Sequence, residues 1–142
     1  MRSFDLKDWK SMRRCLQEKI FCDYSSFRNE KPGKILCNDY VAKRKSALAD
    51  LKTQHNLFNV SIQYSANLAK STCNYAIYRF HPKFAGAKKH FFHSYGQYSF
   101  ELKRNRRQWK ISSITQTLLV NEGNPELHGA TRKGIKKEAD PL

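Results

Sequence analysis

Four side chains of this protein belong to the types that transfer protons in enzymes: Asp5, Tyr24, His55 and His81. General acid–base catalysis uses carboxylates, phenols and imidazoles that lie within hydrogen-bond reach of one another and of a substrate. Each of the four also has a purely structural explanation. Asp5 can cap a helix, and Tyr24 can be a core aromatic with a satisfied hydroxyl. His55 can be a satisfied turn residue between a helix and a strand, and His81 precedes a proline at a strand end.

Helices are expected in the first third of the chain. Apolar residues recur at three- and four-residue steps after Asp5, which predicts a helix over 5–18 with Ser3 or Asp5 as its cap. A second apolar stripe predicts a helix over 39–52. Between them, proline and glycine at Pro32 and Gly33 indicate a loop.

Strands dominate the rest of the chain. Alternating and aromatic-rich segments predict them at 20–24, 57–66, 71–82, 90–104 and 108–121. Helices followed by a run of antiparallel strands are the order of an α+β domain whose helices pack on one side of a curved sheet.

The segment 90–104 indicates what such a sheet encloses. Successive side chains of a strand point to opposite faces. One face of this strand is mostly apolar, with small or hydroxylated members near its middle: Phe92, Ser94, Gly96, Tyr98, Phe100 and Leu102. That composition favours a sheet that lines a pocket over one that is wholly covered by core.

Composition sets the limits. A chain of 142 residues with 39% hydrophobic residues suits one folded domain, expected over 1–128, followed by a polar, disordered tail over 129–142. No apolar run of transmembrane length and no signal-peptide pattern is present, so a cytoplasmic protein without a membrane partner is expected. The four cysteines lack a C-x-x-C spacing and are expected to be buried free thiols, with no metal site: Cys15, Cys22, Cys37 and Cys73.

The formal net charge of +15 is unevenly distributed. Residues 51–110 contain 11 lysines and arginines and one acid, Glu101. A basic surface attracts polyanions such as nucleic acid. Lysine and arginine also keep exposed strand edges soluble and unpaired. Because the basic residues do not interleave with a recognisable aromatic platform, nucleic acid stays the less favoured partner.

Five short motifs, in order, resemble scytalone dehydratase. They are Ser3-Phe4-Asp5-Leu6-Lys7-Asp8-Trp9, Asp23-Tyr24-Ser25-Ser26-Phe27, Leu51-Lys52-Thr53-Gln54-His55, Tyr78-Arg79-Phe80-His81 and Trp109-Lys110-Ile111. The wider relatives that this pattern resembles are the SnoaL-like members of the nuclear transport factor 2-like superfamily. The resemblance extends over about residues 3–127.

The resemblance implies an α+β cone, a curved antiparallel sheet wrapped by N-terminal helices around a closed pocket that works without a metal or cofactor. Asp5 and His55 would form a dyad in which the carboxylate orients the imidazole and favours its protonated form. His55 would take a carbon-bound proton and pass it to a leaving hydroxyl. His81 would help to hold the substrate, and Tyr24 would polarise its carbonyl through a water.

The chain also departs from the dehydratase pattern. Phe4 replaces a second carbonyl-directed tyrosine, and Gly96 and Tyr98 replace a serine and an asparagine. A different substrate is therefore expected, with Phe4, Phe58, Phe92 and Tyr98 as its contacts. In these families a long helix precedes the Asp-x-x-Asp-Trp pattern. Because Asp5 lies four residues after Met1, we expect either that this helix is missing or that the chain is a truncated version of a longer product. The pocket would then stand open or be covered by a partner chain.

Two functions follow as hypotheses. The first is a cofactor-free lyase or isomerase, dehydratase- or cyclase-like, that acts on a small cyclic or polyketide-like ketone. The alternative is a non-catalytic member of the same fold that binds a small ligand or another protein. In either case a homo-oligomer, a dimer or trimer, is expected.

Overall fold

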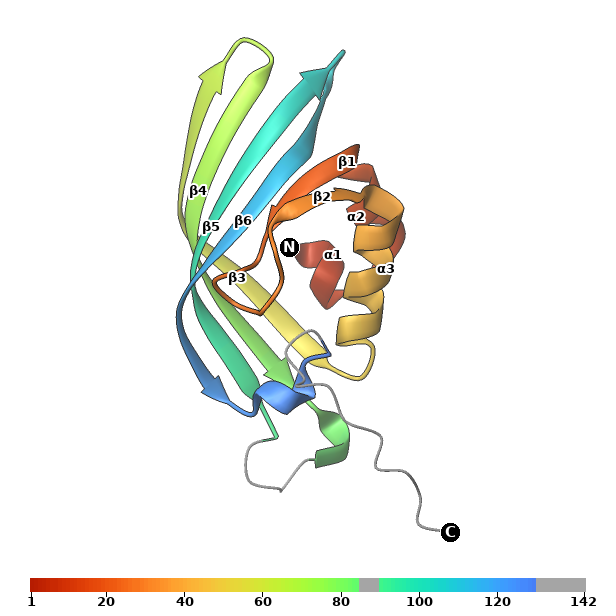
Figure 1. The fold of residues 1–142 in the computed structure, drawn as a ribbon, viewed down its shortest axis with the longest axis vertical. Helices are drawn as coiled ribbons and strands as arrows, with labels where there is room; N and C mark the ends of the chain where they lie inside the picture. Colours follow the sequence, from red (N-terminus) through yellow and green to blue (C-terminus); the bar gives the residue numbers. More distant parts are fainter. Residues whose placement is uncertain (85–89, 130–142) are drawn as a thin grey trace.

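A computed structural model of the chain describes residues 1–84 and 90–129. Apart from Gly129, the tail over 129–142 that was predicted to be disordered lies outside the described residues. The framework is one strongly curved six-stranded sheet with the strand order β2-β1-β6-β5-β4-β3 (Figure 1). Its strands are β1 (Leu16–Asp23), β2 (Gly33–Leu36), β3 (Lys52–Ser65), β4 (Leu68–Phe80), β5 (Phe92–Asn105) and β6 (Gln108–Gly123). The α+β class and the curved sheet are as predicted.

One strand pair differs from the expected antiparallel sheet. Strands β3 to β6 form an antiparallel meander, but β1 pairs with β6 in parallel. The two strands are the first and last of the sheet in the sequence, so no local turn signal indicates their pairing. The sheet is therefore mixed and open rather than closed into a barrel.

The N-terminal helix is shorter than predicted. In place of one helix over 5–18 the structure has α1 (Arg2–Asp5) and α2 (Trp9–Arg14). The chain turns at Lys7, which has a φ of 53°, and Asp8 caps α2 by accepting a hydrogen bond from the Ser11 amide at 3.0 Å. Because the cap restarts the helix at residue 9, Asp5 lies at the end of a separate helical turn.

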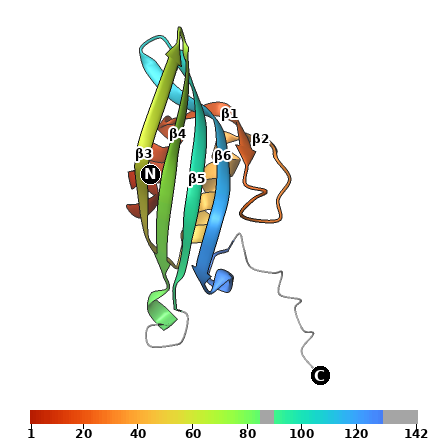
Figure 2. The ribbon, with the colours of Figure 1, turned by 90° about the vertical axis from the view of Figure 1, so that its left-hand side faces the viewer.

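The second predicted helix corresponds to α3 (Cys37–Leu48), which ends in a short turn before β3 begins at Lys52. The three helices cover the concave face of the sheet over its lower part, while the ends of β3–β6 extend beyond them (Figures 1 and 2). None of the described helices is long and apolar enough to cross a membrane.

Two irregularities decide which side chains of the sheet face inward. Asn59 has a φ of 52° in a bulge of β3, and it reverses the alternation, so that Phe58 points out and Val60 and Ile62 point in. Gly96 of β5 lies opposite a bulge of β6, where an added Cβ would come within 2.1 Å of the Thr117 carbonyl oxygen. The backbone therefore requires glycine at this position, where the dehydratase pattern has a serine.

Two groups of buried side chains form the core between helices and sheet. One lies around Ile20, Tyr40 and Ile77, and its partly buried neighbours border a cavity. The other lies at the lower end and consists of Phe27, Leu48, Leu51, Phe92 and Leu127. The candidate site lies between these two groups.

Candidate functional site

An apolar chamber of about 250 Å³ lies between the helices and the concave face of the sheet. Met1, Phe4 and Met12 line it from the helices, and most of its other walls are aliphatic and aromatic side chains of the sheet. Val60 and Ile62 border it at the ends of the strands and are about half exposed. The chamber is therefore open on that side, unlike the closed pocket of the resemblance.

Asp5 and His55 meet behind Phe4, which lines the chamber, but neither of the two residues borders the chamber itself. The last residue of α1 places its carboxylate against β3, where Asp5 Oδ1 lies 2.6 Å from His55 Nδ1. The His55 amide donates to Asp5 Oδ2 at 2.9 Å, and the Thr53 hydroxyl donates to Asp5 Oδ1 at 3.0 Å. The ring of Phe4 stacks on the imidazole at a centroid distance of 4.8 Å. Both carboxylate oxygens are thus fixed, and the imidazole is held on one face by an aromatic ring.

The protonation of the pair follows from its burial. Burial lowers the pKa of His55 and outweighs the hydrogen bond and charge of Asp5, which raise it. For Asp5, burial acts to raise the pKa, but the hydrogen bonds and charge of His55 bring it below its ordinary value. Asp5 thus favours the protonated imidazole, but burial shifts the balance toward the neutral form. A neutral His55 donates its Nδ1 proton to Asp5 and has a free lone pair on Nε2, which is the form of a general base.

A second, polar cavity of about 20 Å³ adjoins His55. Phe4, Tyr24 and Tyr98 line both this cavity and the apolar chamber. The Tyr24 hydroxyl hydrogen-bonds the Tyr40 hydroxyl at 2.7 Å. Burial raises the pKa of Tyr24 and Tyr98 well above the ordinary value, so both phenols keep their protons.

Three buried arginines form the rest of the polar wall. Arg28, Arg44 and Arg79 are 7%, 7% and 2% exposed, and all three line the polar cavity. Arg79 donates to the Ser94 hydroxyl at 2.7 Å, and burial lowers the pKa of Arg79 to about 10. The guanidinium of Arg28 lies 4.0 Å from the centre of the Tyr24 ring.

Sequence reasoning missed these arginines because it assigned the basic residues to the surface. Strand alternation could have indicated Arg79, which shares the inward face of β4 with Cys73, Tyr75 and Ile77. Gln116 and His128 also line the polar cavity and were not expected there. Burial, followed by the nearby arginines, lowers the pKa of His128 well below its ordinary value.

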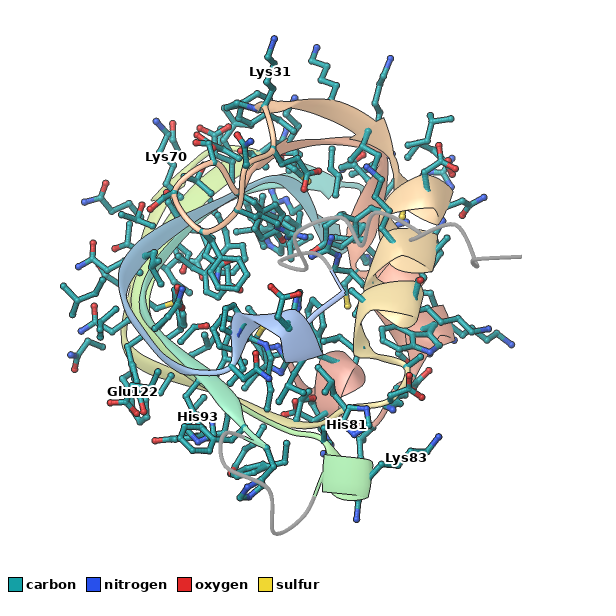
Figure 3. The ribbon with its side chains drawn as sticks, turned by 60° about the horizontal axis from the view of Figure 1, so that its bottom comes forward. Lys31, Lys70, His81, Lys83, His93 and Glu122 are labelled. Atoms are coloured by element: carbon teal, nitrogen blue, oxygen red, sulfur yellow. The ribbon has the colours of Figure 1, made fainter. Side chains whose placement is uncertain are left out.

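Three residues expected in the pocket lie elsewhere. Phe58 is 52% exposed, because strand alternation from His55 and Leu57 places it on the outer face of β3. Phe92 is 1% exposed and belongs to the lower core, where it stacks on Phe27 at 6.1 Å. His81 is buried after the end of β4, where its amide donates to the His90 carbonyl, and it borders neither cavity (Figure 3).

The cysteines differ partly from expectation. Cys37 and Cys73 are buried, but Cys22 is half-buried and Cys15 is exposed at the end of α2, where the chain turns into β1. Within the described ranges no three metal-binding side chains of the histidine, cysteine or carboxylate type come together.

The buried histidines predict that acid destabilises the fold. Both His55 and His128 have a lowered pKa in the folded state, whereas the unfolded chain binds protons with the ordinary value of 6.5. The stabilisation is complete above pH 6.5 and is lost as the pH falls below it, by about 1.4 kcal/mol per pH unit for each histidine that stays neutral. Asp5 does not contribute in this window, since its lowered pKa acts below 3.8.

Urea unfolding at pH 7.5 and pH 5.5 measures this effect. We expect a clearly lower free energy of unfolding at pH 5.5, and a smaller drop in His128→Gln. Equal stability of the wild-type protein at the two pH values would contradict the buried neutral histidines.

The curved sheet with helices on its concave face defines the nuclear transport factor 2-like α+β cone. Residues 1–115 match the SnoaL-like domain, and the chain belongs to this family. No curated protein sequence is significantly similar to the chain.

Solved structures share the fold at low identity. The Kfla4162 protein from Kribbella flavida has a TM-score of 0.80 and 21% identity over 84% of this chain and 83% of its own. A candidate scytalone dehydratase from Novosphingobium aromaticivorans has a TM-score of 0.72 and 14% identity over 87% and 78%. A hexachlorocyclohexane dehydrochlorinase, LinA type 2, has a TM-score of 0.69 and 12% identity over 86% and 79%. At these identities the likeness establishes the fold.

Proposed function

We propose that the chain is a cofactor-free lyase or isomerase that acts on a small cyclic or polyketide-like ketone. The observation that carries the proposal is the pair of His55 Nδ1 and Asp5 Oδ1, 2.6 Å apart, beside a polar cavity that shares three lining residues with an apolar chamber. A neutral imidazole oriented by a carboxylate is suited to remove a proton from carbon next to a carbonyl. The names of two structural neighbours, a dehydratase and a dehydrochlorinase, denote elimination reactions.

The reaction would be an elimination of water. His55 Nε2 takes the proton from the carbon next to the carbonyl, and the carbon–carbon double bond forms as the carbon–oxygen bond of the leaving hydroxyl breaks. The proton passes from His55 to that hydroxyl, and water leaves, so the imidazole returns to its neutral form. Asp5 accepts the hydrogen bond from the Nδ1–H of His55 throughout and stabilises the transient imidazolium.

Tyr24 is suited to stabilise the negative charge that develops on the carbonyl oxygen. Its phenol keeps its proton because burial raises its pKa, and its hydroxyl lies at the boundary of the chamber and the polar cavity with Tyr40 as hydrogen-bond partner. A donor fixed before the reaction stabilises a developing oxyanion without reorganisation. His81 has no part in this scheme, since it borders neither cavity.

Incubation with a panel of small cyclic β-hydroxyketones tests the proposal. We expect one or more members to lose water without added metal or nucleotide, followed as a mass decrease of 18 units (about one water) and as the absorbance of a conjugated enone. If the protein binds panel members but converts none, the lyase proposal fails.

That outcome would favour a binding protein of the same fold. The exposure of Val60 and Ile62 at the open side of the chamber is the observation that supports this second candidate, because an enzyme that eliminates water benefits from a closed site. We also propose a homo-oligomer, a dimer or trimer, because large apolar side chains are exposed on the extended strands, among them Tyr64, Leu68 and Leu119.

A further inference from the structure

The polar cavity beside His55 concentrates positive charge that the elimination scheme does not use. Arg28, Arg44 and Arg79 reach it from three different elements: the turn after β1, helix α3 and strand β4. Each guanidinium is held against aromatic rings, with Arg44 5.3 Å from the centre of the Tyr24 ring and Arg79 5.2 Å from that of Phe92. Aromatic faces attract cations but offer no hydrogen-bond acceptors in the plane of the guanidinium.

The described residues do not neutralise this charge. Within residues 1–84 and 90–129, Glu30 makes the one ion contact with the three arginines, at 3.6 Å from Arg28 Nε, and it also lies 3.7 Å from Lys43. Glu30 is partly exposed and lies outside the polar cavity. Buried charges are normally paired, since an unpaired one loses its hydration without compensation.

The hydrogen-bond inventory leads to the same conclusion. Among the described residues, four buried guanidinium nitrogens have no acceptor: Nε and Nη1 of Arg28, Nε of Arg44 and Nε of Arg79. Such unsatisfied donors destabilise a fold and are rare in native proteins. Four of them around one cavity indicate that their acceptor is a bound anion rather than a protein group.

We infer that the polar cavity binds the carboxylate of a small organic acid whose apolar body occupies the adjoining chamber. A carboxylate presents two oxygens in a plane, which matches the paired donors of a guanidinium. The volume of about 20 Å³ is close to the room that one water needs, so without movement of its walls the cavity accepts one carboxylate oxygen and not a whole ligand. The chamber of about 250 Å³ provides the space for the rest, and Phe4, Tyr24 and Tyr98 belong to both.

The surroundings favour the approach of an anion. Arg44 also lines two surface hollows of about 180 and 390 Å³, and Arg28 lines the larger. Lys31, Lys34 and Lys43 border these hollows, with Glu30 as their acidic member. An excess of positive charge around a cleft raises the local concentration of anions.

This inference deepens the proposed function, and rests on it only in assigning the bound acid as a substrate. It defines the substrate class as ring-containing keto acids whose acidic end lies beside His55. Binding of the acid is a separate property that requires no turnover.

Calorimetric titration with cyclohexanecarboxylate and benzoate tests the binding, with the matched neutral amides, cyclohexanecarboxamide and benzamide, as controls. We expect the acids to bind about 10- to 100-fold more tightly than the amides, as charge-assisted hydrogen bonds would give. In Arg79→Met the preference for the acids should disappear. Methionine keeps the apolar stem against Phe92, and removal of a buried, poorly paired charge should leave the melting temperature equal or higher.

Arg104→Met is the matched control, because Arg104 lies exposed on β5 over Trp109 and far along the strand from the polar cavity. It should keep the preference for the acids. Arg28→Met repeats the test on a second guanidinium, so that the answer does not depend on the folding of one variant. Equal binding of acids and amides by the wild-type protein, or an unchanged preference in both Arg79→Met and Arg28→Met, would overturn the inference.

His55→Ala separates this inference from the proposed function. The variant should still prefer the acids, because its guanidinium groups are intact, while it loses any elimination activity. Preference for acids without turnover in the wild-type protein would sustain carboxylate binding and refute the lyase. Turnover of neutral ketones without a preference for acids would support the lyase and refute carboxylate binding.

Discussion

His55→Ala should lower elimination activity about 100- to 10,000-fold, the usual contribution of a general base, while the protein stays folded. Among the described residues that line the polar cavity, His55 is the one whose buried, neutral imidazole can accept a proton near pH 7 while its other nitrogen is held by a carboxylate. Initial rates on a substrate from the hydroxyketone panel, with circular dichroism to establish folding, measure the loss.

Asp5→Asn should produce a loss of similar size by a different route. An asparagine can turn its amide toward His55 Nδ1, which favours the tautomer with the proton on Nε2 and removes the base from the substrate side. The double variant should be hardly worse than either single one, because the two residues act as a unit.

Asp8→Asn is the matched control for Asp5→Asn. Asp8 is an exposed helix cap three residues away, and asparagine caps helices about as well as aspartate. It should therefore keep full activity and stability. Additive losses in Asp5→Asn and His55→Ala would contradict the dyad.

Phe92→Ala should destabilise the fold by about 3–5 kcal/mol, the usual effect of emptying a buried phenylalanine site. Phe92 is 1% exposed and fills the lower core between Phe27, Leu48 and Leu127. Urea unfolding measures the loss. If Phe92→Ala instead kept its stability and lost ligand affinity, the side chain would belong to the binding site.

Phe58→Ala removes the same side chain from the outer face of β3 and serves as the comparison. Since Phe58 is half exposed, its loss should change the free energy of unfolding by less than about 1 kcal/mol. The pair thus distinguishes two phenylalanines that the sequence alone placed together in the pocket.

The fold was largely predictable because its signals are local. Alternating strands and the turn residues between them indicate the meander from β3 to β6, and short motifs indicate the family. The prediction of one helix over 5–18 was wrong because the apolar spacing continues into β1. Leu16 and Ile20 are buried there as residues of a strand and not of a helix. The helix is broken at Asp8, which caps the start of α2. An aspartate inside a helical pattern is only a weak signal of such a break.

The site was predictable where it follows the family motifs and not where it depends on register or burial. Asp5 and His55 lie together in the positions that the resemblance implied. Phe58 was misplaced because plain alternation along β3 was not applied: with His55 facing inward, position 58 falls on the opposite face. The three arginines were missed because burial of an unpaired charge is improbable for a fold alone. The anion inferred above would account for their presence.

Proton exchange in D₂O tests the central claim most directly. The wild-type protein, with a cyclic ketone from the panel, should replace hydrogen by deuterium at the carbon next to the carbonyl, which NMR detects in the recovered ketone. His55→Ala should exchange no faster than the uncatalysed reaction. Exchange at the wild-type rate in folded His55→Ala would contradict the assignment of His55 as the base.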